Sequence, residues 1–167
     1  LVVNGDTIFK INLKKALIQH NKHSSDCSLL LKPMENFDRY GVVELNEDDS
    51  VQSFKEKQFY KTGLINGGVY ILNAEQFLAE ELPSKFSFEK DYLEKYFETR
   101  KIYGSVQDEY FIDIGIPEDY FRVQQELKQP PLDLKNIDKE WTLFLDRDGV
   151  INYEKKDDYI RNWQEFK

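Results

Sequence analysis

Short apolar, strand-like runs alternate with helix-like segments along most of this 167-residue chain, and this alternation constrains the fold more than any other feature. The strand patterns cover residues 27–31, 40–45, 51–56, 68–72 and 110–114, and the helical patterns cover residues 11–22, 74–82, 88–100 and 117–127. Alternation of this kind favours an α/β fold with an open, largely parallel sheet. Ligands of such sheets bind beyond the carboxyl ends of the strands.

Local signals refine these elements. Residues 46–50 have the composition of a hairpin turn between two strands. The aromatic and apolar residues of the segment 88–100 recur at helical spacing, so they are predicted to be core. Pro117 occupies the favoured first position of a helix, and a Gln-Pro-Pro sequence ends that helix. We therefore predict a domain boundary at residues 129–139.

Composition limits the possible binding partners and the expected cellular location. The chain can bury one core, or one domain plus part of another. A formal net charge of −8 argues against nucleic acid or an anionic membrane as a partner. The single cysteine, Cys27, excludes an internal disulfide, and no apolar run is long enough to span a membrane, so a cytoplasmic location is expected. Because Leu1 enters what reads as the middle of a strand, we expect the chain to be a fragment.

Two carboxylates follow a short apolar strand near the C-terminus. Asp146 and Asp148 stand one residue apart before Gly149, and alternate residues of a strand share one face. One carboxylate could then attack phosphorus while the other moves a proton. A calcium loop is disfavoured because Val150 and Ile151 occupy the positions that need an oxygen ligand and a glycine. A plain acidic turn is the simpler alternative.

The run Phe144-Leu-Asp-Arg-Asp-Gly-Val-Ile-Asn152 resembles motif I of the haloacid-dehalogenase phosphatases, particularly their histidinol-phosphate and heptose-bisphosphate branch. The resemblance implies that residues 140–167 contain the first strand of a phosphatase domain. It also implies that Asp146 and Asp148 are catalytic residues and metal ligands. The later Ser/Thr, Lys and acidic motifs of such a phosphatase are missing from this sequence.

Five short motifs in the first 128 residues occur in the order found in another family. They are Asn4-Gly-Asp6, Tyr40-Gly-Val-Val-Glu44 with Phe54-Lys-Glu-Lys57, Ile65-Asn-Gly-Gly-Val-Tyr70, Phe86-Ser-Phe-Glu-Lys-Asp91 and Phe111-Ile-Asp-Ile-Gly-Ile-Pro117. Together they resemble the C-terminal part of a sugar-phosphate nucleotidyltransferase. The resemblance implies a Rossmann-like mixed sheet with helices on both faces. The family's glycine-rich, basic nucleotide loop is missing from this sequence.

The nucleotidyltransferase resemblance also implies a reaction and its residues. A sugar 1-phosphate attacks the α-phosphorus of a nucleoside triphosphate, with GTP favoured, and pyrophosphate leaves. Asp6 and Asp113 would be ligands of Mg²⁺ (or Mn²⁺), a hard ion that accepts few protein oxygens. The substrate-binding residues would be Lys57 for the sugar phosphate, Glu56 and Glu89 for sugar hydroxyls, and Asn66 and Gly67 for close approach to the ring.

Each of these motifs has an ordinary structural explanation when it is taken alone. Asn4-Gly5 is a common hairpin turn, Glu56-Lys57 a solvated charge pair, and Asn66-Gly67 part of a turn. Asp113 could be a strand-end cap. His20 and His23 are predicted to be exposed and not catalytic.

The two resemblances describe consecutive steps. A phosphatase of the heptose-bisphosphate type leaves a sugar 1-phosphate, which a nucleotidyltransferase then activates. We therefore expect the parent protein to be bifunctional in nucleotide-activated heptose synthesis, with mannose 1-phosphate guanylyltransferase as the near alternative. A non-catalytic folding or oligomerisation module and a stand-alone phosphatase are the other hypotheses, and a homo-oligomer could form through surface exposed by truncation.

Overall fold

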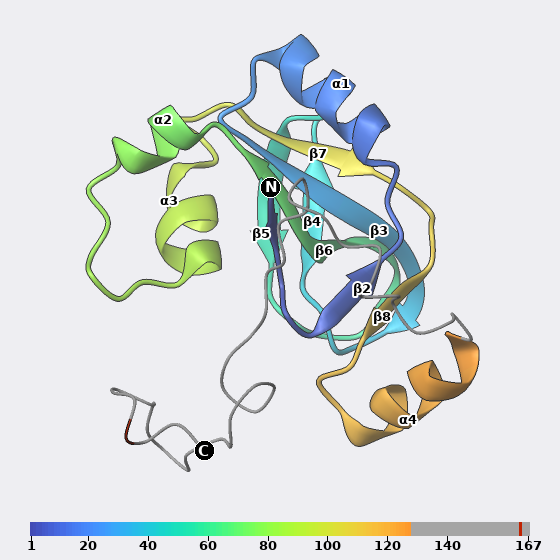
Figure 1. Ribbon diagram of the computed structural model, residues 1–167. Helices are drawn as coiled ribbons and strands as arrows, with labels where there is room; N and C mark the ends of the chain where they lie inside the picture. The colour runs from blue at the N-terminus through green and yellow to red at the C-terminus, as the bar shows by residue number, and fades with distance from the viewer. Residues whose placement is uncertain (128–163, 165–167) are drawn as a thin grey trace. The chain divides into compact units, whose positions relative to one another are not determined.

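The computed structural model describes residues 1–127 and Gln164 (Figure 1). The chain divides into two compact units, Leu1–Glu126 and Leu127–Lys167. The predicted linker at residues 129–139 lies outside the described residues. So does the predicted start of a phosphatase domain at residues 140–167, with Asp146 and Asp148, apart from Gln164. Within the described part, no helix has the length and apolar character needed to cross a membrane.

A four-stranded sheet forms the centre of the first unit, in the order β1 (Val2–Val3), β6 (Tyr60–Leu72), β3 (Cys27–Phe37) and β7 (Ile102–Val106). The pairs β1–β6 and β3–β6 are antiparallel, and β3–β7 is parallel. The sheet is therefore mixed, and the expectation of a largely parallel sheet is wrong. No helix separates β3 from β6, so the chain makes no crossover there and the two strands pair antiparallel.

Two small strand pairs flank this sheet: β2 (Thr7–Phe9) with β8 (Phe111–Asp113), and β4 (Val42–Leu45) with β5 (Val51–Lys55). The hairpin predicted around residues 46–50 is confirmed, and Asn46 N donates to Ser50 O at 2.9 Å in its turn. Asn4 and Gly5, in contrast, do not make a hairpin, because the strands on either side pair with different partners, β6 and β8.

Alternate residues of β3 face opposite layers. Leu29 and Leu31 pack with Tyr92 and Leu93, whereas Leu30 packs in a separate cluster with Ala16. These leucines are fully buried, which stabilises each by about 1.5–3 kcal/mol relative to exposure. The predicted helices on both faces are therefore confirmed.

The helix α1 (Leu13–His23) covers the Leu30 face, and α2 (Ala74–Leu78), the π-helix η1 (Phe88–Leu93) and α3 (Glu94–Tyr96) lie against the other (Figure 1). Asn12 caps α1 by accepting from Lys15 N at 2.9 Å. The single helix predicted over residues 88–100 is thus divided into a π-turn and a short α-helix. The predicted start of α4 (Pro117–Glu126) at Pro117 is confirmed.

β6 contains an irregularity at its glycines. Leu29 pairs with Tyr70 and Leu31 with Asn66, so β6 has two more residues than β3 between these pairs. Gly68 has φ +69°, a conformation that non-glycine residues seldom adopt. The Asn66-Gly67-Gly68 sequence is thus a bulge within a long strand and not a turn between elements, and bulges redirect side chains.

Candidate active site

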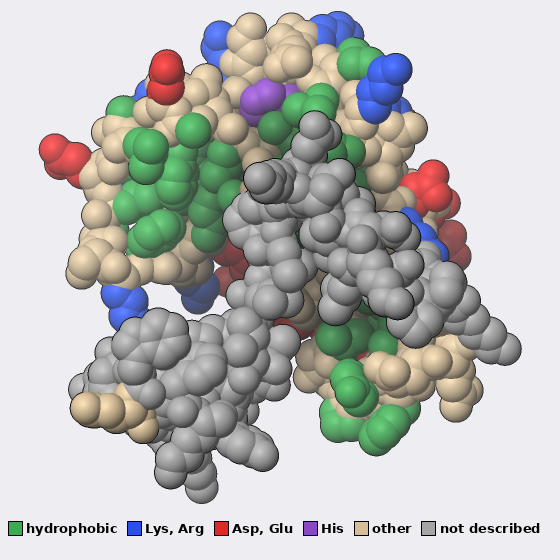
Figure 2. All heavy atoms as spheres, in the orientation of Figure 1, with side chains coloured by type: hydrophobic (Ala, Val, Ile, Leu, Met, Phe, Trp, Pro, Cys, Tyr) green, Lys and Arg blue, Asp and Glu red, His purple; other side chains and the backbone are tan. Residues whose placement is uncertain are grey.

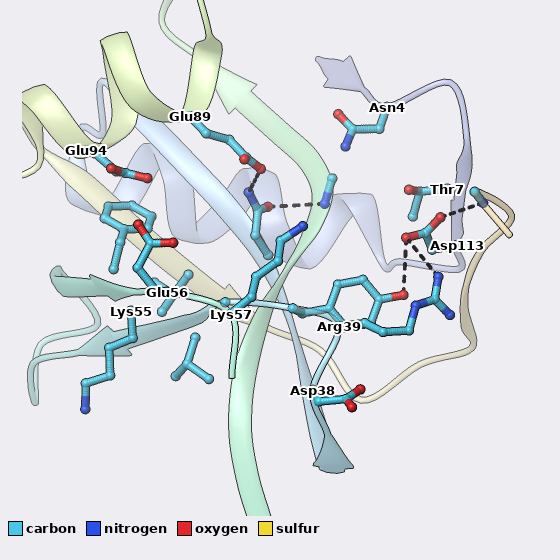
Figure 3. A pocket seen from close by; sticks show the side chains of 18 of the residues that line it. Asn4, Thr7, Asp38, Arg39, Lys55, Glu56, Lys57, Glu89, Glu94 and Asp113 are labelled. Carbon is cyan, nitrogen blue, oxygen red and sulfur yellow. Dashed lines mark hydrogen bonds and ion pairs between the residues drawn. The ribbon is translucent and has the colours of Figure 1, made fainter. Parts of the chain in front are cut away.

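A cavity of about 740 Å³ opens at the ends of several strands (Figure 3). Its wall is built by the turn after β1, the β4–β5 hairpin, the bulge of β6, η1 and the end of β8. Of the residues predicted to form a site, this wall includes Asp6, Glu56, Lys57, Asn66, Glu89 and Asp113. Segments far apart in the sequence are therefore brought together around one space.

Asp6 and Asp113 are brought together by the pairing of β2 with β8. Thr7 lies opposite Asp113 in this ladder, and Ile114 N donates to Asp6 O at 2.8 Å. Both carboxylates line the cavity. Because the ladder fixes the two backbones, these carboxylates reach the cavity from neighbouring strand ends.

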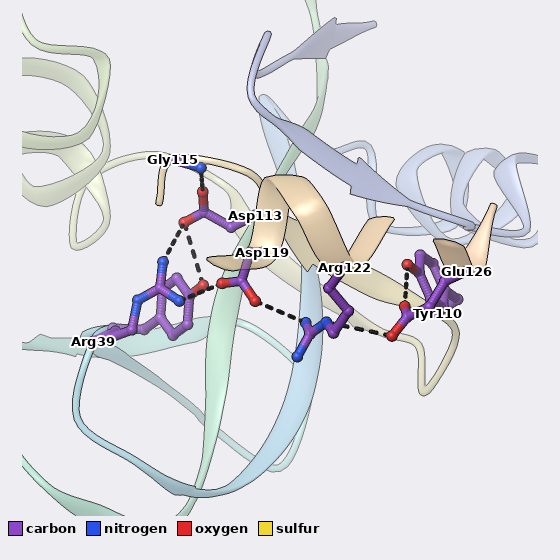
Figure 4. Close-up of polar contacts among 8 residues, drawn as sticks. Arg39, Tyr110, Asp113, Gly115, Asp119, Arg122 and Glu126 are labelled. Carbon is purple, nitrogen blue, oxygen red and sulfur yellow. Dashed lines mark hydrogen bonds and ion pairs between the residues drawn. The ribbon is translucent and has the colours of Figure 1, made fainter. Parts of the chain in front are cut away.

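Two hydrogen bonds orient the Asp113 carboxylate, and a guanidinium lies nearby (Figure 4). Its Oδ1 accepts from Gly115 N at 2.8 Å, and its Oδ2 accepts from Tyr40 OH at 3.2 Å. Arg39 lies 3.8 Å from the same Oδ2. Burial, with the nearby Asp113 charge, raises the pKa of Tyr40 to about 12, so its hydroxyl stays protonated and able to donate.

The carboxylates of Asp6 and Asp113 suit a small hard cation that takes most of its ligands from water and substrate. Among residues 1–127, no group of three or more His, Cys, Asp or Glu side chains could hold a metal ion. Mg²⁺, however, usually takes one or two protein carboxylates and completes its shell with water and substrate phosphate. Asp6 and Asp113 supply that number.

Lys57, like Lys90, is a cavity-lining cation available to a substrate anion. It lines the cavity with Glu56, and no ion pair of Lys57 is found within the described part of the chain. The neighbouring Lys55 instead pairs with Glu44, and its side chain points away from Lys57 in Figure 3. In the same view Lys57 lies between Glu56 and Glu89 on one side and Asp113 on the other.

Hydrogen bonds at the bulge in β6 hold the Asn66 side chain in one orientation. Its Oδ1 accepts from Gly68 N at 3.2 Å, and its Nδ2 donates to Tyr70 OH at 2.8 Å and to Glu89 Oε1 at 3.2 Å. Gly67 is not part of the cavity wall. A Cβ on Gly67 would lie 2.4 Å from the Phe9 ring, so the missing side chain makes room for core packing.

Glu89 is held at the cavity by the start of η1. Ser87 Oγ accepts from Lys90 N at 3.3 Å, and Ser87 N donates to Asp91 Oδ2 at 2.7 Å. These reciprocal contacts satisfy backbone groups at the helix start. π-Helical turns recur at functional sites, and this one carries both Glu89 and Lys90 into the wall.

The family model described as Nucleotidyl transferase matches residues 1–130. The chain belongs to this nucleotidyl transferase family. The match covers the whole described cavity, so the five motifs identified in the sequence correspond to one family domain.

Curated relatives point in the same direction. The chain is 50% identical over 128 residues to the D-glycero-alpha-D-manno-heptose 1-phosphate guanylyltransferase of Aneurinibacillus thermoaerophilus, covering 77% of this chain and 55% of that protein. It is 48% identical over 120 residues to the enzyme of the same name from Campylobacter jejuni subsp. jejuni serotype O:2, covering 72% and 52%. The chain therefore spans about half the length of the curated relatives it matches.

The crystal structure of HddC from Yersinia pseudotuberculosis is similar in fold, with a TM-score of 0.65 and 38% identity over 75% of this chain and 54% of that chain. A second structure of the same protein, complexed with GMP-PN, has a TM-score of 0.64.

The cavity of this member of the nucleotidyl transferase family also contains residues that the sequence analysis did not assign. Among them are Arg39 and Tyr40, which contact Asp113, and the lining residues Asn4, Lys90 and Glu94. Four of these, all but Glu94, lie within or beside the quoted motifs, so motif position was the signal that could have indicated them. Asp146 and Asp148 lie outside the described residues.

Proposed function

We propose that this protein takes part in transfer of a nucleotidyl group, with guanylyl favoured, from a nucleoside triphosphate to a sugar 1-phosphate of the heptose or mannose type. The main support for this proposal is that Asp6, Asp113 and Lys57 line the same cavity. The names of the two bacterial relatives support the guanylyl group and the heptose.

The chemistry joins two anions, so charge neutralisation is the main requirement. A Mg²⁺ or Mn²⁺ ion held by Asp6 and Asp113 would supply positive charge to the triphosphate oxygens. Lys57 binds the phosphate of the sugar as a point charge. Glu56 and Glu89 accept hydrogen bonds from sugar hydroxyls.

The bulge in β6 sets the distance of closest approach to the sugar. Asn66 holds Glu89 in place through its amide. The sequence predicted that the sugar ring would approach the backbone closely at Gly67. We assign this role to Gly68, because Gly68 lines the cavity and Gly67 does not.

The test is nucleotidyl transfer by the full-length parent protein with GTP, ATP, CTP and UTP against heptose and mannose 1-phosphates. Asp6→Asn should lower transfer by more than about a hundredfold, because one of two metal carboxylates is lost. Asp108→Asn, which removes a carboxylate paired with Lys32 outside the cavity wall, is the charge-matched control and should retain activity. Equal activity of Asp6→Asn and wild type would refute the metal assignment.

The phosphatase half is proposed on the nine-residue motif around Asp146 and Asp148. In the parent protein, Asp146→Asn should eliminate hydrolysis of a sugar bisphosphate, because no aspartyl-phosphate can form, and leave transfer from a supplied sugar 1-phosphate nearly intact. Loss of both activities in a folded Asp146→Asn protein would contradict two separate sites.

The remaining hypotheses make different predictions. A folding or oligomerisation module would show no saturable Mn²⁺ binding, whereas a site with Asp6 and Asp113 should bind Mn²⁺ in the millimolar range or tighter. A stand-alone phosphatase does not account for the family match over residues 1–130.

A further inference from the structure

Arg39 lies between two carboxylates, only one of which faces the cavity. Its Nη1 donates to Asp119 Oδ2 at 2.5 Å, and its Nη2 is 3.8 Å from Asp113 Oδ2. We propose that Asp119 is a positioning residue, which holds the Arg39 guanidinium off Asp113 so that Asp113 stays available to a divalent cation. This inference rests on the proposed function, because it assumes that Asp113 is a metal ligand.

Asp119 is built to hold a guanidinium firmly. It lies in the first turn of α4, and its side chain is 12% exposed, against 38% for Arg39. Arg122, one turn further along α4, contacts the other oxygen of Asp119 at 3.0 Å. Arg122 is itself fixed by Glu126 at 3.3 Å, which accepts from Tyr110 OH at 2.7 Å (Figure 4).

The two contacts of Arg39 differ in kind. The short contact with Asp119 is a charge-assisted hydrogen bond, whereas the separation from Asp113 exceeds hydrogen-bonding distance. The hydrogen bond from Arg39 to Asp119 is also the main cause that raises the Arg39 pKa. Without Asp119, Asp113 is the carboxylate within reach of this guanidinium.

A guanidinium that settled on Asp113 would compete with a metal ion for the same oxygens. Within residues 1–127, Arg39 is the charged side chain that lies within ion-pair distance of Asp113, so its position sets how much negative charge Asp113 offers to the cavity. Partners that orient metal ligands from outside the coordination shell typically alter metal affinity by about 10–100-fold when they are mutated. Asp119 acts in this way through Arg39.

Mn²⁺ titration followed by electron paramagnetic resonance tests the proposal without reference to turnover. Asp119→Asn should weaken Mn²⁺ binding by about tenfold or more. Arg39→Gln should bind Mn²⁺ at least as tightly as wild type, and Arg39→Gln in the Asp119→Asn background should restore wild-type affinity. The charge-matched Asp108→Asn variant should bind as wild type does.

Three results would overturn the proposal: unchanged Mn²⁺ affinity in folded Asp119→Asn, weaker binding in Arg39→Gln, or no rescue in the double variant. Thermal melting establishes that each variant is folded. If Asp119→Asn does not fold, the Arg39→Gln comparison alone decides the outcome. Absence of Mn²⁺ binding by wild type also overturns it, whereas Mn²⁺ binding without nucleotidyl transfer refutes the proposed function and leaves this arrangement standing.

Discussion

At the scale of single residues, the imidazole of His20 is enclosed between α1 and β3. Its Nδ1 lies 2.9 Å from Ser28 Oγ, and the residue is 9% exposed. The prediction that His20 is exposed is therefore wrong, because the polar residues around it in the sequence lie on the outer side of α1. Burial, opposed in part by Asp26, lowers the pKa of His20.

This lowered pKa makes folding depend on pH. The unfolded chain binds a proton at His20 more readily than the folded chain, so stability falls as the pH drops below the ordinary histidine value of 6.5. His20→Gln, which keeps a hydrogen-bonding side chain, should flatten this fall. Thermal melting between pH 5 and 8 measures the effect.

His23→Gln serves as the control, since His23 is only half-buried and stacks on Tyr103 with ring centroids 4.3 Å apart. In that variant the melting temperature should fall with decreasing pH as it does in the wild type. A wild-type melting temperature that rises on acidification through this range would contradict the assignment.

The residue types of the site could be predicted from the sequence, and their partners could not. Asp6, Lys57 and Asp113 were predicted to share a site, and all three line one cavity. Arg39 and Asp119, 2.5 Å apart in space, are far apart in the chain and share no motif. Arg39 lies in the connection between β3 and β4, and Asp119 lies in α4, which packs against β8. Only the folded structure brings the two side chains together.

At the scale of elements, the bulge in β6 shapes the cavity wall. A Cβ on Gly68 would lie 2.8 Å from Asn4 Nδ2, and a φ of +69° is unfavourable for any residue that has a Cβ. Gly68→Ala should therefore reduce the free energy of unfolding by about 1–3 kcal/mol. Urea unfolding monitored by circular dichroism measures the loss.

A double variant separates the two causes. Asn4→Ala combined with Gly68→Ala should recover the steric part of the loss and leave the backbone part. If Gly68→Ala alone were as stable as wild type, the bulge would not have the backbone conformation described.

Elements marked by characteristic turn or helix-start residues were predicted correctly from the sequence. Strands that depend on pairing with distant segments were not. Pro117 and the turn at residues 46–50 marked their elements because their chemistry is local. β7 was not predicted, since Gly104 and Ser105 interrupt its apolar pattern; its position depends on pairing with β3. The first half of β6 was also not predicted, because polar residues and Gly63 interrupt its apolar pattern.

At the scale of the whole molecule, β1 forms one edge of the described sheet, and within residues 1–127 no strand pairs with its outer side. Val2 and Val3 are 40% and 59% exposed. Further hydrophobic side chains gather at the surface over α2 and α3 in Figure 2. Leu78 of α2 is itself 80% exposed. Open strand edges with apolar side chains favour pairing with another chain.

We therefore expect this chain to self-associate through β1 in a concentration-dependent manner. Val3→Lys should shift the chain toward monomer, because a charge on an edge strand opposes edge-to-edge pairing. Sedimentation velocity over a range of concentrations measures the shift. Ile18→Lys, at a similarly exposed site on α1, should leave association unchanged; a monomer at every concentration would refute the expectation.

The ladder between β2 and β8 has a consequence for the newly synthesised protein. Thr7 can pair with Asp113 only after the whole segment between these two residues has been translated. Contacts this distant in sequence form late, because closing the intervening loop costs entropy before the pairing stabilises it. The nascent chain therefore has no formed pocket until β8 has been made, and capture of a divalent ion by both carboxylates must follow that point.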